Sequence, residues 1–282
     1  MAFSTTNAAS EYLAASKQRI PLVKTATRTS VALIPFSVFD LAGNPGAGTL
    51  AGANSANGVV PTDLVNGTPL INAFGSGNTG YLTKVEYYSS VISRIAIYDL
   101  LWKGGTYAYN SGTTNLSSQP AISSRCPDYP GSGTVFGNGV ELWVEVSTAF
   151  STGNSWQIQV TYTNSEGTTG RTSIISAAQA AAALTLGKMF QLALQAGDSG
   201  VQKIESVIAT NGGTAMTAGA VNVLLMRKLW ENRVGVANGG GIDDIFKTGS
   251  PVVYSDSALV LVITPDSTST GLPNVTAEIT NA

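Results

Sequence analysis

Glu141 and Glu145 come nearest to a catalytic pair by type and spacing, since Trp143 lies between them on one face of an alternating segment. Two carboxylates beside an aromatic ring are what a sugar-cleaving site would need. Four residues along a strand separate the carboxylates by about 13 Å, whereas glycosidases use roughly 5 to 9.5 Å. We therefore expect a solvated or subunit-facing sheet surface here and no hydrolytic site.

The segment Gly75–Gly80 matches the G-x-G-x-x-G phosphate-binding fingerprint letter for letter. That fingerprint works when a strand precedes it and the N-terminus of a following helix receives the pyrophosphate. Here a coil precedes the glycines and a strand-like segment follows them. We therefore expect an ordinary loop.

The other candidate chemistry is limited by what the chain lacks. Histidine is absent, which removes the usual general base near neutral pH and the Ser-His and Cys-His nucleophile pairs. The single cysteine, Cys126, can form no disulfide within the chain and is expected to be a small, partly buried side chain. Four C-terminal aspartates lack the spacing of a known calcium loop, namely Asp243, Asp244, Asp256 and Asp266. We expect no enzyme, no metal and no cofactor.

Composition excludes two further classes of function. Charged residues make up 11% of the chain and the net charge is −2, so no bulk electrostatic attraction for nucleic acid is expected. No run of about 18 apolar residues occurs, so no transmembrane helix is expected. The N-terminus lacks the features of a signal peptide, which predicts folding in a cytoplasm.

The segment around Trp143 must be positioned by strands. Val140–Val146 and Trp156–Thr163 each alternate apolar and polar residues with a period of two, which is typical of half-buried strands. The Ser-Thr-Gly-Asn-Ser sequence at 151–155 is rich in turn residues, so we expect a β-hairpin. Because a hairpin cannot bury its apolar face alone, a partner sheet is expected.

Further strands follow from the same patterns. We expect a second hairpin from about Phe190 to Ile208, a core strand or helix at Val221–Trp230, and a central strand at Tyr81–Trp102. Ala258–Thr264 is expected to be buried. Two segments are expected at sheet edges, namely Val31–Leu41, which Pro35 interrupts, and Val275–Ile279.

These elements predict a mainly β protein, an antiparallel β-sandwich of jelly-roll-like type with long Gly/Asn-rich loops. A short N-terminal helix is expected after Ser10. We divide the chain into residues 1–80, a basic arm with an edge strand and extended loops, and residues 81–282, the β-sandwich. The basic arm carries four cations that could dock on an acidic partner or simply be solvated, namely Lys17, Arg19, Lys24 and Arg28.

The chain resembles virion structural proteins of tailed bacteriophages, of the head decoration or cement type. The resemblance lies in the segments IAIYDLLW (95–102), GVELWVEVSTAF (139–150), VTYTNSEGTTGRTS (160–173), LALQAGDSGVQKIESV (192–207) and SALVLVITPDSTSTGLP (257–273). It implies a non-enzymatic protein of the virion, assembled in the host cytoplasm, that binds and stabilises the major capsid protein shell. It also implies a homotrimer or another symmetric oligomer, and it supplies no catalytic residue.

Two other functions are compatible with the sequence. A tail, neck or baseplate protein of the same virion would have the same composition, and copy number would distinguish it from a head protein. A glycan-binding module would use exposed aromatic rings as stacking platforms, for which the candidates are Trp143, Tyr107 and Tyr109.

Overall fold

The computed structural model describes residues 15–50, 55–116, 119–126, 128, 133–151, 155–174, 179–180, 183–211 and 216–281. In these residues the chain is mainly β, with one short 3-10 helix, η1 (Ser123–Arg125), and one short α-helix, α2 (Ile245–Thr248). The strands form antiparallel sheets, so the predicted fold class is confirmed. The helix expected after Ser10 lies outside the described residues.

Contacts divide the chain into two compact units, each made of separate stretches of sequence. Unit 1 comprises the described parts of 1–48, 62–99 and 229–282, and unit 2 those of 49–61 and 100–228. Two long strands, β6 (Ser93–Ala108) and β14 (Ala220–Val234), contribute residues to both units. The division at residue 80 stays a prediction, because contacts do not test which segment folds by itself.

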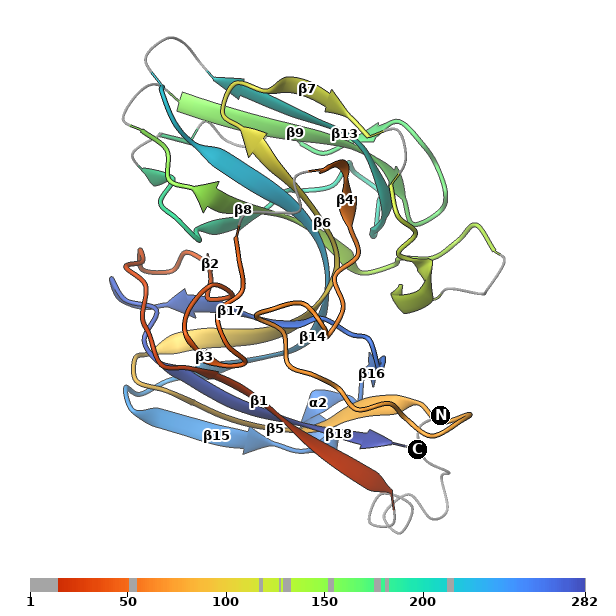
Figure 1. Ribbon diagram of the computed structural model, residues 1–282, viewed down its shortest axis with the longest axis vertical. Helices are drawn as coiled ribbons and strands as arrows, with labels where there is room; N and C mark the ends of the chain where they lie inside the picture. The colour runs from red at the N-terminus through yellow and green to blue at the C-terminus, as the bar shows by residue number, and fades with distance from the viewer. Residues whose placement is uncertain are drawn as a thin grey trace. The chain divides into compact units, whose positions relative to one another are not determined.

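In unit 1, one sheet has the strand order β15-β5-β18-β1-β3 (Figure 1). Its strands are β15 (Gly239–Asp243), β5 (Gly80–Ser89), β18 (Pro273–Asn281), β1 (Ser16–Lys24) and β3 (Gly43–Asn44), with β16 (Val252–Val253) also paired to β5. The opposing layer contains β17 (Leu259–Pro265), β2 (Phe36–Ser37) and the unit 1 parts of β6 and β14. Alternating side chains from both layers form one buried core, including Leu22, Val275, Ile97 and Leu261.

In unit 2, one sheet has the order β10-β9-β13-β7 (Figure 1). These strands are β10 (Arg171–Thr172), β9 (Ser155–Asn164), β13 (Val201–Asn211) and β7 (Gly112–Asn115), with β11 (Gln179–Ala180) also paired to β9. The second layer has the order β12-β8-β14-β6, where β12 is Met189–Gln191 and β8 is Val140–Thr148, and β4 (Ser55–Val59) also pairs with β6. The core between the layers includes Val144, Val223, Ile158 and Ile204.

Both predicted hairpins are wrong, although their strands exist. β8 pairs with β12 and β14, whereas β9 pairs with β10, β11 and β13, so the two strands lie in different sheets. β12 and β13 are divided between the same two sheets. The physical reason is that each strand buries its apolar face against the other across the core, and period-two alternation does not say which neighbour is hydrogen-bonded.

Other strand predictions had mixed outcomes. Val221–Trp230 is a strand, β14, and the helix alternative is wrong. The strand expected over Val31–Leu41 is wrong for most of its length, since only Phe36–Ser37 forms a strand, β2, although β2 does lie at the edge of its sheet. Val275–Ile279 is not an edge, because β18 lies between β5 and β1. Within the described residues, no helix has the length and hydrophobicity that a membrane span requires.

Candidate functional site

The first two cations of the predicted basic arm lie on strand β1, which is paired with β18. Lys17 is exposed on this strand. Arg19 forms an ion pair with Glu86, with 2.6 Å between the guanidinium and Oε2. This part of the arm is therefore a strand of the sheet, and docking of an acidic partner on Lys17 and Arg19 stays a prediction.

The other two cations are used inside the protein. Lys24 is buried and donates a hydrogen bond of 3.0 Å from Nζ to the Leu41 carbonyl. Burial lowers the pKa of Lys24 to about 8, although Asp40 attracts its charge. The Arg28 side chain is 8% exposed and is ion-paired with Asp40. A solvated arm is therefore wrong for Lys24 and Arg28, because these charges are compensated by neighbours within unit 1.

The proposed stacking aromatics are not surface platforms. Trp143 is 7% exposed and Tyr107 is 4% exposed. The Trp143 indole donates to Glu141 Oε2 at 2.8 Å, and burial raises the pKa of Tyr107. Tyr109 is partly buried against the core of unit 2. The expectation that these rings are exposed is corrected, because neighbouring elements cover the alternating faces on which they lie.

The two glutamates of the sugar-site motif also lie in different environments. Glu141 is partly exposed, whereas Glu145 is 3% exposed. Glu145 Oε2 accepts a hydrogen bond from Asn222 Nδ2 at 2.9 Å and lies 3.5 Å from Lys103 Nζ. The expectation of a solvated pair is therefore wrong for Glu145, which is part of a buried polar cluster.

The glycine fingerprint and the C-terminal aspartates are structural. Gly75 lies in a loop that leads directly into strand β5. Asp243 accepts hydrogen bonds from Trp230, Asn232 and Lys247, while Asp244 caps helix α2. In the part of the chain that the structure describes, no three or more metal-ligating side chains converge.

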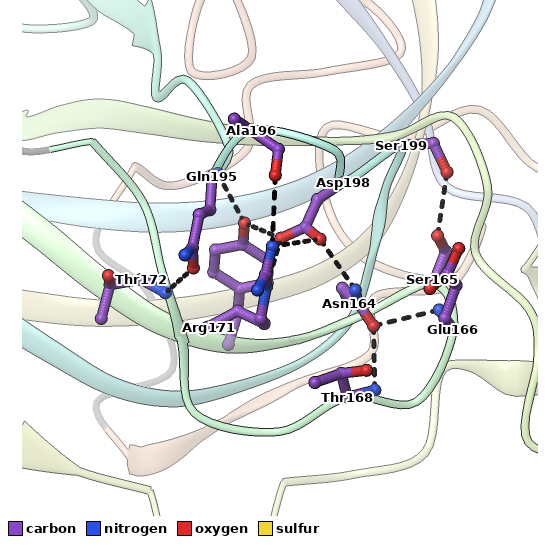
Figure 2. A network of polar contacts seen from close by, with 11 residues as sticks. Asn164, Ser165, Glu166, Thr168, Arg171, Thr172, Gln195, Ala196, Asp198 and Ser199 are labelled. Carbon is purple, nitrogen blue, oxygen red and sulfur yellow. Dashed lines mark hydrogen bonds and ion pairs between the residues drawn. The ribbon is translucent and has the colours of Figure 1, made fainter.

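The most extensive polar network around one carboxylate is centred on Asp198, in a turn after β12 (Figure 2). We call Tyr162, Asn164, Arg171, Gln195 and Asp198 the Asp198 network. Its members come from the end of β9, from β10 and from the 195–199 turn. The network therefore ties two turns of unit 2 together.

Asp198 accepts three hydrogen bonds in this network and forms an ion pair with Arg171. Its Oδ2 accepts from the Tyr162 hydroxyl at 2.6 Å and from Arg171 Nε at 3.0 Å. Its Oδ1 accepts from Asn164 Nδ2 at 2.8 Å and lies 3.0 Å from an Arg171 terminal nitrogen. The Tyr162 hydroxyl in turn accepts a hydrogen bond from the main-chain N–H of Gln195 at 2.8 Å. The acceptor sites of the carboxylate are thus filled.

Electrostatics of the network follow from this geometry. Burial raises the pKa of Asp198, but hydrogen bonds from Arg171, Tyr162 and Asn164 outweigh burial and hold it below the usual value. Burial and the bond to Asp198 raise the pKa of Tyr162 to about 12. At neutral pH the carboxylate is therefore charged and the phenol is neutral, which is a stable arrangement with no free nucleophile or base.

A second set of bonds fixes the loop between β9 and β10. Asn164 Oδ1 accepts from the amides of Glu166 at 3.1 Å and Thr168 at 2.9 Å. Glu205 Oε1 accepts from the Thr163 hydroxyl at 2.8 Å and from the Gly170 amide at 3.1 Å. The Asn164 bonds are the local Asx-type contacts that asparagine favours in turns, whereas Glu205 on β13 connects the loop to a neighbouring strand.

These hydrogen bonds fix the backbone of both turns, and residues of both turns are exposed to solvent. Glu166, Thr168 and Gly170 are exposed, as are Gln195 and Ser199 in the other turn. We call these exposed residues the two-turn surface. The hairpin expected from about Phe190 to Ile208 implies a turn near Asp198, whereas no turn was predicted at residues 164–170, and the connection between the two segments was missed. The only signal was the Asn and Asp content of the two turns, and nothing in their spacing shows that they meet.

Each unit contains a cavity. One, of about 220 Å³ in unit 1, is lined by Leu33, Ser93, Arg94, Arg233, Thr264 and Asp266. The other, of about 260 Å³ in unit 2, is lined mainly by Gln119, Pro120, Ile122, Phe136, Gln202 and Lys203. Neither brings together the paired carboxylates that acid and base catalysis by this chain would need.

No family model matches the chain, and no curated protein matches it. Among solved structures, it is similar to that of the Gx strain of infectious bursal disease virus, with 9% identity, a TM-score of 0.20, and coverage of 95% of this chain and 80% of that one. The VP2 subviral particle of infectious bursal disease virus has 11% identity, a TM-score of 0.20, and coverage of 94% and 79%. The T=1 particles derived from infectious bursal virus have 10% identity, a TM-score of 0.19, and coverage of 94% and 76%. At these TM-scores the similarity carries no argument about fold or function.

Proposed function

We propose that the chain is a non-enzymatic structural protein of a virus particle, of the decoration or cement type of tailed bacteriophages, which binds the major capsid protein. The observation that carries this proposal is the two-turn surface, where hydrogen bonds to the Asp198 carboxylate fix the backbone of exposed turns. A rigid surface loses little conformational entropy when a neighbour binds to it.

Exposed apolar side chains on unit 1 support the same proposal. Val236, in the turn before β15, is 70% exposed, Ile242 on β15 is 65% exposed and Phe246 on α2 is 93% exposed. β15 ends its sheet, so one side of this strand lacks a strand partner among the described residues. Exposed apolar residues beside a sheet edge are a common site of association. A homotrimer or another symmetric oligomer is part of the proposal, and light scattering on the purified chain would measure it.

Particle stability is the direct test. Particles that lack this protein should lose their genome at lower temperature or after milder osmotic shock than complete particles, and adding back the purified chain should restore resistance. Equal stability of particles with and without the protein would disprove a cement function.

Copy number distinguishes this function from a tail, neck or baseplate role. Densitometry of intact particles should give roughly hundreds of copies of this chain per particle if it decorates the head. A few copies to a few dozen per particle would instead place the protein at a vertex, neck or baseplate.

A further inference from the structure

Three chemically complementary side chains meet in unit 2, namely an amine, a carboxylate and a primary amide. Lys103 is on β6, Glu145 on β8 and Asn222 on β14, and β14 is the strand between the other two. Asn222 and Glu145 are direct partners in the β14–β8 register. All three side chains are buried, and Asn222 is fully buried.

The three groups converge on one oxygen atom. Glu145 Oε2 lies 3.5 Å from Lys103 Nζ and accepts from Asn222 Nδ2 at 2.9 Å. The same amide nitrogen also donates to the Leu50 carbonyl, which fixes the orientation of the amide. A single carboxylate oxygen thus lies next to a potential nucleophile and next to the nitrogen that would leave.

The amide oxygen gives a second, independent observation. Among the described residues, Asn222 Oδ1 has no hydrogen-bond partner although it is buried. Buried polar atoms are rarely left in this state, so each such atom requires an explanation. A Cβ atom at residue 105 would overlap this oxygen, and Gly105 has φ 144. Glycine on β6 therefore lets the amide lie close to the strand that carries Lys103.

We propose that Lys103 and Asn222 form an intramolecular isopeptide bond with Glu145 as the proton carrier. Glu145 takes one proton from the Lys103 ammonium, and the neutral amine attacks Asn222 Cγ, which forms the Nζ–Cγ bond. Glu145 passes this proton to Nδ2 and takes a second proton from Nζ, and the Cγ–Nδ2 bond breaks as ammonia leaves. The ammonia takes the second proton from Glu145, so one side-chain ammonium and one primary amide give one secondary amide and one ammonium ion, and no oxidant or cofactor is required.

The geometry of the strands favours this reaction. Neighbouring strands carry the reacting groups, which removes most of the entropic cost of bringing them together. The product would join β6 covalently to β14 and so link two strands that are far apart in the sequence.

The test is the intact mass of the denatured full-length chain. The wild type should be lighter than its sequence mass by one ammonia, and proteolysis should release one peptide pair joined through Lys103 and Asn222. The Lys103→Met and Glu145→Gln variants should have their full sequence masses. The Glu141→Gln variant should keep the mass loss, because Glu141 is on the same strand but its carboxylate lies 3.7 Å from Lys228 Nζ, outside the Lys103–Asn222 cluster.

Peptide mapping is essential, since an Asn-Gly sequence can also lose ammonia by closing a ring. A wild-type chain of full mass, or an ammonia loss mapped to any other residue, would overturn the proposal. Retention of the Lys103–Asn222 link in Glu145→Gln would overturn the role of Glu145. The mass measurements do not require the variants to fold, because the mass of the wild-type chain alone decides whether the bond exists.

Discussion

At the scale of single residues, Asp198 shows how this chain uses its few charged groups. Its side chain is 2% exposed and lies beside Arg171, while Tyr162 and Asn164 fill the remaining acceptor positions. A buried carboxylate is tolerated only when it is paired and fully hydrogen-bonded. Asp198 meets this condition, so its role is to stabilise the two-turn surface.

Removing this carboxylate should destabilise the chain strongly. Asp198→Ala leaves the Tyr162 hydroxyl and the Asn164 amide without their acceptor, so the free energy of unfolding should fall by about 2–4 kcal/mol. Urea denaturation followed by circular dichroism measures the loss. Glu166→Gln is the matched control in the same exposed loop and should change stability by less than about 0.5 kcal/mol. Equal effects of the two variants would contradict the assigned role.

Acid should weaken the same network. The pKa of Asp198 is held below its usual value, mainly by the hydrogen bonds that outweigh burial. A carboxylate with a lowered folded-state pKa stabilises the protein above its unfolded pKa of about 3.9, and this contribution is lost as pH falls through the folded value. The free energy of unfolding should therefore decrease below about pH 5, and less steeply in Asp198→Asn. Parallel pH profiles of the two proteins would argue against this contribution.

At the scale of elements, strands β8 and β9 face each other across the core of unit 2 instead of pairing. Trp156 of β9 is fully buried, packs edge-on against Phe150 with ring centroids 5.0 Å apart, and donates to the Tyr109 carbonyl at 3.1 Å. One side chain thus contacts the chain segment that leads from β8 to β9 and the end of β6. The packing across the core therefore depends on it.

Trp156→Ala should open a cavity in this core. The expected loss in the free energy of unfolding is about 3–5 kcal/mol, as for other large aromatic truncations. Thermal denaturation would measure it. Val135→Ala is the control, because Val135 is 59% exposed and its truncation should cost less than about 0.5 kcal/mol. A small effect of Trp156→Ala would mean that the two layers do not pack as described.

At the scale of the whole molecule, function is expected at surfaces. Phe246 on α2 is 93% exposed, and helix α2 is a single turn fixed by its Asp244 cap and by Gly249 with φ 70. Such a ring contributes nothing to the core of unit 1, so its position is best explained by contact with another molecule.

Phe246→Ser should weaken binding to other molecules and leave the stability of the chain nearly unchanged. The free energy of unfolding should change by less than about 0.5 kcal/mol, whereas binding to capsids or self-association should weaken by about tenfold or more, as for an interface anchor. Sedimentation with particles that lack the protein measures binding. Leu64→Ser is the control, since Leu64 is 78% exposed in a different loop, and it should bind normally. Unchanged binding of Phe246→Ser would exclude this surface.

The sequence by itself determined the strands, because period-two alternation in segments such as 156–163 and the apolar run at 258–264 depends only on local chemistry. It also determined that histidine-based catalysis is absent from this chain. Only the tertiary structure decided which strands are neighbours, since pairing depends on contacts between residues that are far apart in the sequence. For the same reason, the burial of Lys24 and Trp143, the hydrogen bonds and ion pair of Asp198, and the meeting of Lys103, Glu145 and Asn222 appear only once the layers are packed.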